Sequence, residues 1–167
     1  MAKKLLLVRH GKSDHGHDLK DFDRPLNHRG NKNAVEMAER SVKRDLVPQL
    51  VISSPAVRAI TTAAHFIDLW DIPKAAVEKD ESIYEANTMA LLNVVNKIDN
   101  DFDLVALFGH NPGLTELTNY LTNSGVYNIP TSGMVLIEFD LEDWAEISKH
   151  TGSMLLFDFP KNTDEPH

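Results

Sequence analysis

The sequence contains no cysteine, few basic residues and no long apolar run. Without cysteine the chain has neither disulfides nor thiolate chemistry. Acidic residues outnumber basic ones by 25 to 17, giving a formal net charge of −8, which argues against a nucleic-acid partner held through phosphate contacts. The apolar run 5–8 is too short for the core of a signal peptide, and no run approaches the ~18 residues of a membrane span. We therefore expect a cytoplasmic protein that binds neither nucleic acid nor membranes.

The length of 167 residues and a hydrophobic content of 42% suit one domain with a sizeable core, and we expect residues 1–167 to form it. Apolar residues are continuous in "KKLLLVRH" (3–10), "QLVISS" (49–54) and "DLVALFGH" (103–110). Continuous rather than alternating apolar residues indicate strands that are buried on both faces. A further short strand or extended segment is expected within 75–86.

Helical periodicity separates these strands. We expect helices over 29–45, 55–70, 88–100 and 112–123, with Gly125 as the stop signal of the last one. Two closely connected strands, "GMVLIEFDL" and "SMLLFDFP", follow and favour antiparallel pairing. The alternation predicts an α/β fold, a three-layer α/β/α sandwich with a mostly parallel central sheet and at least one antiparallel strand near the C-terminus.

Three of the predicted parallel strands end in polar residues that are followed by a helix start. Arg9 and His10 end the first strand, Arg58 follows the second, and His110 ends the fourth. Ser54 and Asn111 are candidate helix N-caps, with a proline after each in the first helical position. Because the carboxyl ends of parallel strands share one edge of the sheet, where ligands bind, these groups should meet there.

Two guanidiniums, two imidazoles and the positive ends of helices would focus positive charge in a protein of net negative charge. A small, multiply charged anion is the expected ligand, and phosphate matches the planar fork of arginine. One unprotonated imidazole can attack phosphorus, while a second, protonated imidazole can stabilise the transferring group. Such a division of labour predicts that the pKa values of His10 and His110 are pushed apart.

Several segments resemble the histidine phosphatase superfamily, the RHG-motif enzymes related to phosphoglycerate mutase. They are "LLLVRHGKS", "VISSPAVRAITTA", "SIYEA" and "ALFGHNPGLTELTNYL". "DFDRPLNHRG" and "TSGMVLIEFD" further resemble its SixA-like branch of phosphohistidine phosphatases. The resemblance implies that His10 is the nucleophile and that Arg9, Arg58 and His110 complete a phosphate pocket. Glu85, in "YEA", matches the region that supplies the proton donor in many relatives.

Other residues keep two interpretations. Ser13 could bond phosphate or close the turn after Gly11, and Arg24 could contact substrate or brace its loop. Asn111 is a further candidate for substrate binding, and Glu85 could be an exposed loop carboxylate. The pair His15 and His17 lacks partners at metal-ligand spacing, so we expect no metal and no cofactor.

The first hypothesis for function is therefore a phosphatase that acts on protein phosphohistidine, such as that of a phosphorelay protein. A phosphatase of small phosphate esters is the main alternative, and a mutase, which favours a closed site, is a weaker one. A phosphate-binding module without turnover would not need the complete set of Arg9, His10, Arg58, His110 and Glu85. A dinucleotide-binding protein is disfavoured because no G-x-G-x-x-G follows the first strand.

Overall fold

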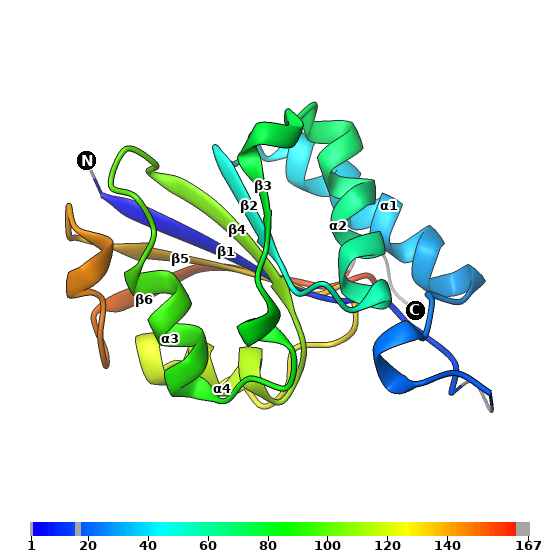
Figure 1. Cartoon of the computed structure of the whole chain (residues 1–167). Coiled ribbons are helices and arrows are strands. Elements are labelled where there is room, and N and C mark those ends of the chain that lie inside the picture. Colours follow the sequence, from blue (N-terminus) through cyan, green and yellow to red (C-terminus); the bar gives the residue numbers. More distant parts are fainter. Residues whose placement is uncertain (1, 16–17, 163–167) are drawn as a thin grey trace.

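Within residues 2–15 and 18–162, which the computed structural model describes, six strands form one sheet in the order β3-β2-β4-β1-β5-β6 (Figure 1). Their bounds are β1 (Lys3–Arg9), β2 (Leu50–Ser53), β3 (Val77–Lys79), β4 (Leu104–Gly109), β5 (Met134–Phe139) and β6 (Gly152–Asp158). The pairs β1–β4, β2–β4 and β2–β3 are parallel, whereas β5 pairs antiparallel with both β1 and β6. The predicted mixed, mostly parallel sheet is confirmed.

Helices cover both faces of the sheet, as the three-layer prediction requires (Figure 1). Their bounds are α1 (His28–Lys43), α2 (Val57–Trp70), α3 (Thr88–Asn96) and α4 (Gly113–Thr122). Short 3₁₀ turns are η1 (Asp21–Asp23), η2 (Lys74–Ala76), η3 (Glu81–Ile83) and η4 (Trp144–Glu146). Because β1 is central, its side chains alternate between two cores and none from Leu5 to Val8 is exposed.

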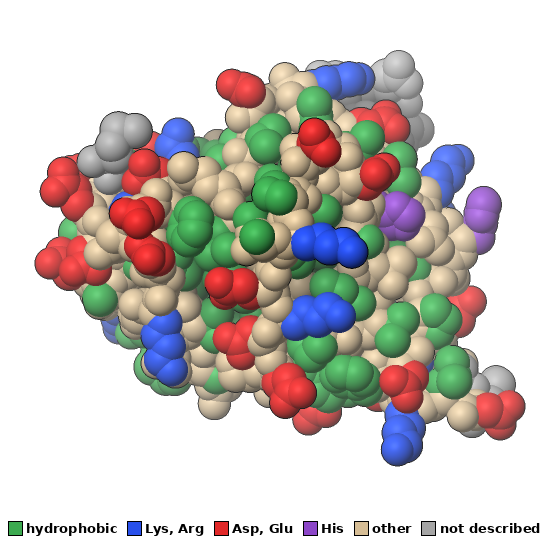
Figure 2. Space-filling view, turned by 45° about the horizontal axis from the view of Figure 1, so that its top comes forward, with side chains coloured by type: hydrophobic (Ala, Val, Ile, Leu, Met, Phe, Trp, Pro, Cys, Tyr) green, Lys and Arg blue, Asp and Glu red, His purple; other side chains and the backbone are tan. Residues whose placement is uncertain are grey.

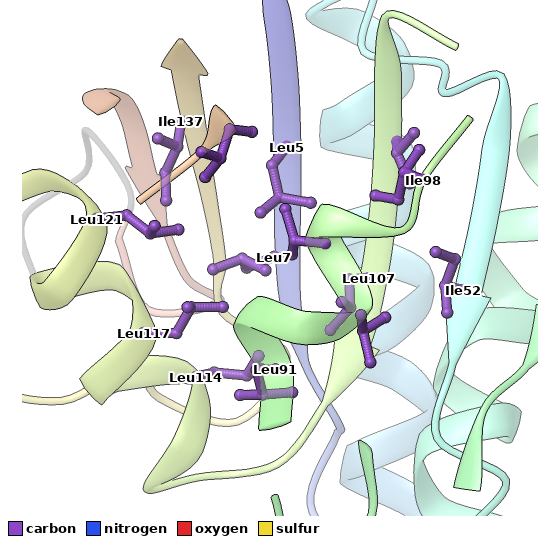
Figure 3. Packing of buried hydrophobic residues seen from close by; sticks show 14 of the residues in the cluster. Leu5, Leu7, Ile52, Leu91, Ile98, Leu107, Leu114, Leu117, Leu121 and Ile137 are labelled. Carbon is purple, nitrogen blue, oxygen red and sulfur yellow. The ribbon is translucent and has the colours of Figure 1, made fainter. Parts of the chain in front are cut away.

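One core lies between the sheet and the helices α3 and α4. Figure 3 shows Leu5 and Leu7 of β1 facing Leu91 of α3 and Leu114 of α4 in this core. The other core lies between the sheet and the helices α1 and α2, where Leu6 and Val8 belong to one cluster with apolar residues of both helices. The strand β1, which leads into the predicted site, is therefore packed on both faces, and this packing holds its carboxyl end in a fixed position.

Several predicted helix boundaries differ from the structure, and α3 ends at Asn96 rather than at residue 100. Ala56, not Ser54, is the N-cap of α2, and Pro55 lies before the helix. Pro112 is the N-cap of α4, although the Asn111 side chain still accepts a hydrogen bond from the Thr115 N–H at 3.2 Å. Each polar side chain also has a partner outside its helix: the Ser54 hydroxyl lies 2.8 Å from His110 Nε2, and the Asn111 amide donates to the Ile129 carbonyl at 2.9 Å. At the end of α4 the C-cap is Asn123, in the left-handed conformation, and Gly125 follows two residues later, also with a positive φ of 69°.

Charged side chains are spread over the surface. On the face shown in Figure 2, acidic and basic side chains are interspersed, and acidic ones gather at the left-hand end of the molecule. Among the described residues no helix is both long and apolar enough to cross a membrane. This face therefore does not carry the concentration of positive charge that the sequence predicts at the ends of the strands.

Candidate functional site

The carboxyl ends of β1, β2 and β4 lie together because the three strands are parallel neighbours. Arg9 pairs in register with Gly109, and Ser53 pairs with Phe108. The residues that follow, His10, Ser54 and His110, thus emerge side by side at one edge of the sheet. The imidazole rings of His10 and His110 are 5.2 Å apart between centroids.

The His10 side chain is held in one tautomer. Its Nδ1 lies 2.7 Å from the Gly11 carbonyl oxygen, and a carbonyl can only accept a hydrogen bond. Nδ1 therefore carries the proton and Nε2 presents a free lone pair. Burial, followed by the nearby charges of Arg58 and Arg9, lowers the pKa of His10 to about 4. At neutral pH this imidazole is unprotonated, which is the form a nucleophile needs.

The His110 side chain lies between Ser54 and Tyr84. Its Nε2 is 2.8 Å from the Ser54 hydroxyl, and its ring contacts the Tyr84 ring edge-on with centroids 5.5 Å apart. Burial and the neighbouring His10 and Arg58 lower the pKa of His110 to about 3. The prediction that the two pKa values are pushed apart is wrong for the protein alone, because burial beside guanidiniums lowers both. A phosphoryl dianion at this position would oppose the shift of His110, since negative charge favours its protonated form.

The two guanidiniums of the predicted site come from different elements, Arg9 from β1 and Arg58 from α2. Arg9 donates from Nη1 to the Ile129 carbonyl at 2.8 Å, and burial lowers its pKa. Arg58 lies in the first turn of α2 and is only 6% exposed. It donates from Nη1 to the Asp21 carbonyl at 2.6 Å and from Nη2 to the Asp21 carboxylate at 3.0 Å. Each guanidinium is thus fixed by other parts of the chain.

Several buried side-chain atoms lack a hydrogen-bond partner, most of them at this edge. Among the described residues these atoms are Arg9 Nε, Arg58 Nε, His110 Nδ1, Ser132 Oγ and Asp158 Oδ2. The first three belong to predicted site residues. Ser132 is beside them, since its backbone N–H bonds to the carbonyls of both Arg9 and His10. Buried polar atoms are usually paired, so four of these five atoms mark one place built for a polar ligand.

The other predicted site residues occupy different positions. Arg24 donates to the Ser13 hydroxyl at 2.7 Å and pairs with the Asp21 carboxylate, so the two side chains brace the loop after β1. The Asn111 amide donates to the Ile129 carbonyl at 2.9 Å and its oxygen accepts from Thr115. Glu85 is exposed and borders a hollow of about 360 Å³ that His110 and Asn111 also line.

Besides Ser132, three residues at this edge were not predicted from the sequence: Asp21, Tyr84 and Thr62. The Asp21 carboxylate accepts from Arg58, Arg24 and the Tyr84 hydroxyl, and these bonds hold its pKa well below its usual range. Thr62 accepts from the Gly11 N–H at 2.9 Å and donates to the Arg58 carbonyl at 2.7 Å. Each of the three lies within a segment that carries the family resemblance, such as "SIYEA" for Tyr84, but no local pattern marked it as a site residue.

Among the residues that the structure describes, no group of three or more His, Asp or Glu side chains is placed to hold a metal ion. His17, one of the histidines considered for such a role, lies outside the described residues, and His15 is exposed. The positive charges close to His10 are guanidiniums of arginine side chains.

Comparison with known proteins identifies the family. The model of the histidine phosphatase superfamily (branch 1) matches residues 5–102, and the chain belongs to this superfamily. An uncharacterized chloroplast protein of Arabidopsis thaliana is 27% identical over 155 residues, which cover 87% of this chain and 71% of that protein. The predicted family is therefore confirmed, and the general activity is that of a phosphatase acting through a histidine.

Solved structures show the same fold. The protein histidine phosphatase SixA complexed with tungstate has a TM-score of 0.80 at 19% identity, covering 94% of this chain and 97% of that one. A mycobacterial glucosyl-3-phosphoglycerate phosphatase in complex with VO3 has a TM-score of 0.74 at 16% identity, covering 95% and 100%. At these identities the likeness establishes the shared architecture and leaves the substrate open.

Proposed function

We propose that the protein hydrolyses protein phosphohistidine through a covalent phosphoryl intermediate on His10, without a metal ion. The observation that carries the proposal is the set of buried, unpartnered polar atoms on Arg9, Arg58, His110 and Ser132 beside the His10 ring. Phosphoryl oxygens accept hydrogen bonds from guanidinium and imidazole N–H groups, and such charge-assisted bonds are strong. Arg9, Arg58 and His110 are therefore proposed to bind the phosphoryl group in front of His10 Nε2.

In the first step His10 Nε2 attacks phosphorus with its lone pair. The new N–P bond forms while the bond from phosphorus to the leaving group breaks, and its electron pair goes to the leaving group, which takes up a proton. The guanidiniums neutralise charge on the equatorial oxygens, as expected when catalysis rests on positioning and electrostatics. The Nδ1–H bond to Gly11 stabilises the positive charge that develops on the imidazole.

In the second step water attacks the phosphoryl group on His10. A new P–O bond forms, the N–P bond breaks and its electron pair returns to Nε2, so that the free imidazole and inorganic phosphate result. The proton of the water passes to a phosphate oxygen or to solvent. No cofactor is consumed, and the enzyme returns to its starting state.

A phosphohistidine substrate suits this site because imidazole is a good leaving group. The bond that breaks is P–N, and imidazole leaves with far less help from an acid than an alkoxide does. This matters because Glu85, the only candidate acid predicted from the sequence, is exposed at the rim. A phosphorylated protein of a cytoplasmic phosphorelay is the partner that this reading favours.

A phosphatase of small phosphomonoesters is the second candidate. Glu85 borders the hollow beside His110, where it could protonate an alkoxide leaving group. The shared fold with a glucosyl-3-phosphoglycerate phosphatase is compatible with this alternative. The two candidates differ in the leaving group and share the chemistry at His10.

The test compares a phosphohistidine peptide with a panel of small phosphate esters. Wild type should cleave the peptide with the higher kcat/KM and yield an acid-labile phosphoenzyme, with or without a chelator. His10→Ala should abolish both signals, whereas His28→Ala, at an exposed position on α1, should change neither. Turnover by the His10→Ala variant would refute the intermediate, and a clear preference for one ester would favour the second candidate.

A further inference from the structure

A row of four aromatic rings runs outward from the proposed nucleophile. The centroids of His10 and His110 are 5.2 Å apart, those of His110 and Tyr84 are 5.5 Å apart, and those of Tyr84 and Phe22 are 5.2 Å apart. The last two contacts are edge-to-face, an arrangement that aromatic pairs prefer. The proposed chemistry uses only the first two rings, so the outer pair, Tyr84 and Phe22, has no assigned role.

Tyr84 spans the distance between two groups of the phosphate site. One side of its ring lies against His110, and its hydroxyl donates to the Asp21 carboxylate at 2.5 Å. The same carboxylate oxygen accepts from Arg58 Nη2 at 3.0 Å. Tyr84 is therefore linked to both His110 and Arg58, which are proposed to bind the phosphoryl group.

The position of the Tyr84 ring is fixed before any substrate arrives. Asp21 is itself held by Arg58 and by Arg24, whose Nη2 is 3.0 Å from the other carboxylate oxygen. The Asp21 bond raises the pKa of Tyr84 to about 12, so the hydroxyl remains a donor across the physiological range. Tyr84 and Phe22 are nevertheless only partly buried, which leaves ring surface available to a ligand.

We infer that Tyr84 and Phe22 form a subsite for a planar aromatic leaving group, such as the imidazole of phosphohistidine, at the outer end of the ring row. This inference rests on the proposed function, since the leaving group must depart outward from a phosphoryl group bound in front of His10. A flat ring can stack on or meet the edges of Tyr84 and Phe22. A small leaving group without a ring, such as ammonia, gains nothing from them.

The experiment uses two compounds that both lose a P–N bond. N-phosphoimidazole releases a ring, and phosphoramidate releases ammonia. Replacing the ring by Tyr84→Leu should lower kcat/KM about three- to tenfold for phosphoimidazole and about twofold or less for phosphoramidate. Tyr84→Phe keeps the ring and loses the bond to Asp21, so the ratio of the two kcat/KM values should stay near that of wild type.

Two further variants complete the design. Phe22→Leu should lower the ratio in the same direction as Tyr84→Leu, and it carries the test if the latter does not fold. Tyr127→Leu, at a tyrosine that is 99% exposed, should leave the ratio unchanged. A purely structural role of Tyr84 would lower the kcat/KM values for both compounds equally. An unchanged ratio of the two values in Tyr84→Leu would therefore overturn the subsite. A fall of this ratio in Tyr84→Phe as large as that in Tyr84→Leu would overturn it as well. If wild type cleaves neither phosphoimidazole nor phosphoramidate, the proposed function and the subsite are overturned together.

Discussion

At the scale of single residues, the site depends on groups whose usual protonation is altered by burial. His10 and His110 are both neutral near pH 7 because burial and nearby guanidiniums lower their pKa values. A neutral His10 is ready to attack, whereas a neutral His110 gains a proton only when negative charge arrives beside it. Phosphate binding and protonation of His110 should therefore be coupled.

Glu85 carries the residue-scale prediction. The residue has a φ of +56°, in the left-handed region that is unfavourable for a side chain other than glycine. Such strain often accompanies function, and the carboxyl group borders the hollow beside His110. Glu85→Gln should slow cleavage of alkyl phosphates by about 10²-fold, since an alkoxide needs a proton donor, and should slow phosphohistidine cleavage much less.

The measurement is kcat/KM of wild type and Glu85→Gln on an alkyl phosphate and on a phosphohistidine peptide. Glu81→Gln, at an exposed carboxylate of the neighbouring turn η3, serves as the matched control. Equal losses on the two substrates would contradict a role as proton donor.

The four residues predicted to form the phosphate pocket share one property: each stands at or shortly after the end of an apolar strand. Arg9, His10 and His110 follow continuous buried runs, and Arg58 stands one helical turn beyond another. Asp21 and Tyr84 could not be found in this way. Their contact depends on how two loops, 63 residues apart in sequence, cross the edge of the sheet, and no local pattern encodes that path.

At the scale of elements, strands were easier to predict than helix boundaries. A strand buried on both faces must be apolar throughout, so β1 and β4 are visible in the sequence. The start of α2 was misplaced because the Ser54 hydroxyl, expected to cap the helix, lies 2.8 Å from His110 Nε2 and accepts from the Ala56 N–H at 3.2 Å. The contact of the Ser54 hydroxyl with His110 thus outweighs the local preference of serine for the N-cap position.

The contact between α1 and the loop after β1 yields the element-scale prediction. A Cβ atom on Gly30 would lie 2.1 Å from the Lys12 carbonyl oxygen and 2.9 Å from its nitrogen. Gly30→Ala must therefore push the loop that follows His10 away from the first turn of α1. We expect a loss of about 1–3 kcal/mol in the free energy of unfolding, together with a fall in kcat.

Urea denaturation and steady-state kinetics on the same preparations test this prediction. Lys32→Ala, on an exposed position of the same helix, should leave both quantities close to those of wild type. A Gly30→Ala variant as stable and active as wild type would show that the loop adjusts without cost to His10.

At the scale of the whole molecule, an acidic chain buries a cluster of basic groups at one edge of its sheet. The clamped strand β1 and the ties from Thr62, Asp21 and Ile129 hold these groups together. Histidines whose pKa is lowered on folding reduce stability in acid, because the unfolded chain binds protons that the folded protein does not. The arrangement that prepares the site should therefore weaken the fold at mildly acidic pH.

The pKa values define the window in which this effect is seen. They are about 4 for His10 and about 3 for His110 in the folded protein, against an ordinary histidine pKa of 6.5 in the unfolded chain. Stability should be unaffected above pH 6.5 and should fall as the pH drops from there toward 4, by about 1–2 kcal/mol per histidine between pH 7 and 5. The lowered pKa of Asp21 stabilises the fold, and this contribution is lost only as the pH falls below the ordinary aspartate pKa of 3.8, outside this window.

Conservative variants separate the contribution of the two histidines to the pH dependence of stability from that of the other residues. His10→Asn preserves a donor toward the Gly11 carbonyl, and His110→Gln preserves a polar partner for Ser54, while neither titrates. Each should remove about half of the stability loss between pH 7 and 5 when unfolding is followed by urea at a series of pH values. His28→Asn, at an exposed histidine, should reproduce the wild-type slope. Curves for His10→Asn and His110→Gln that run parallel to wild type would show that the pH dependence arises elsewhere, and that these imidazoles are not held neutral by burial at the strand ends.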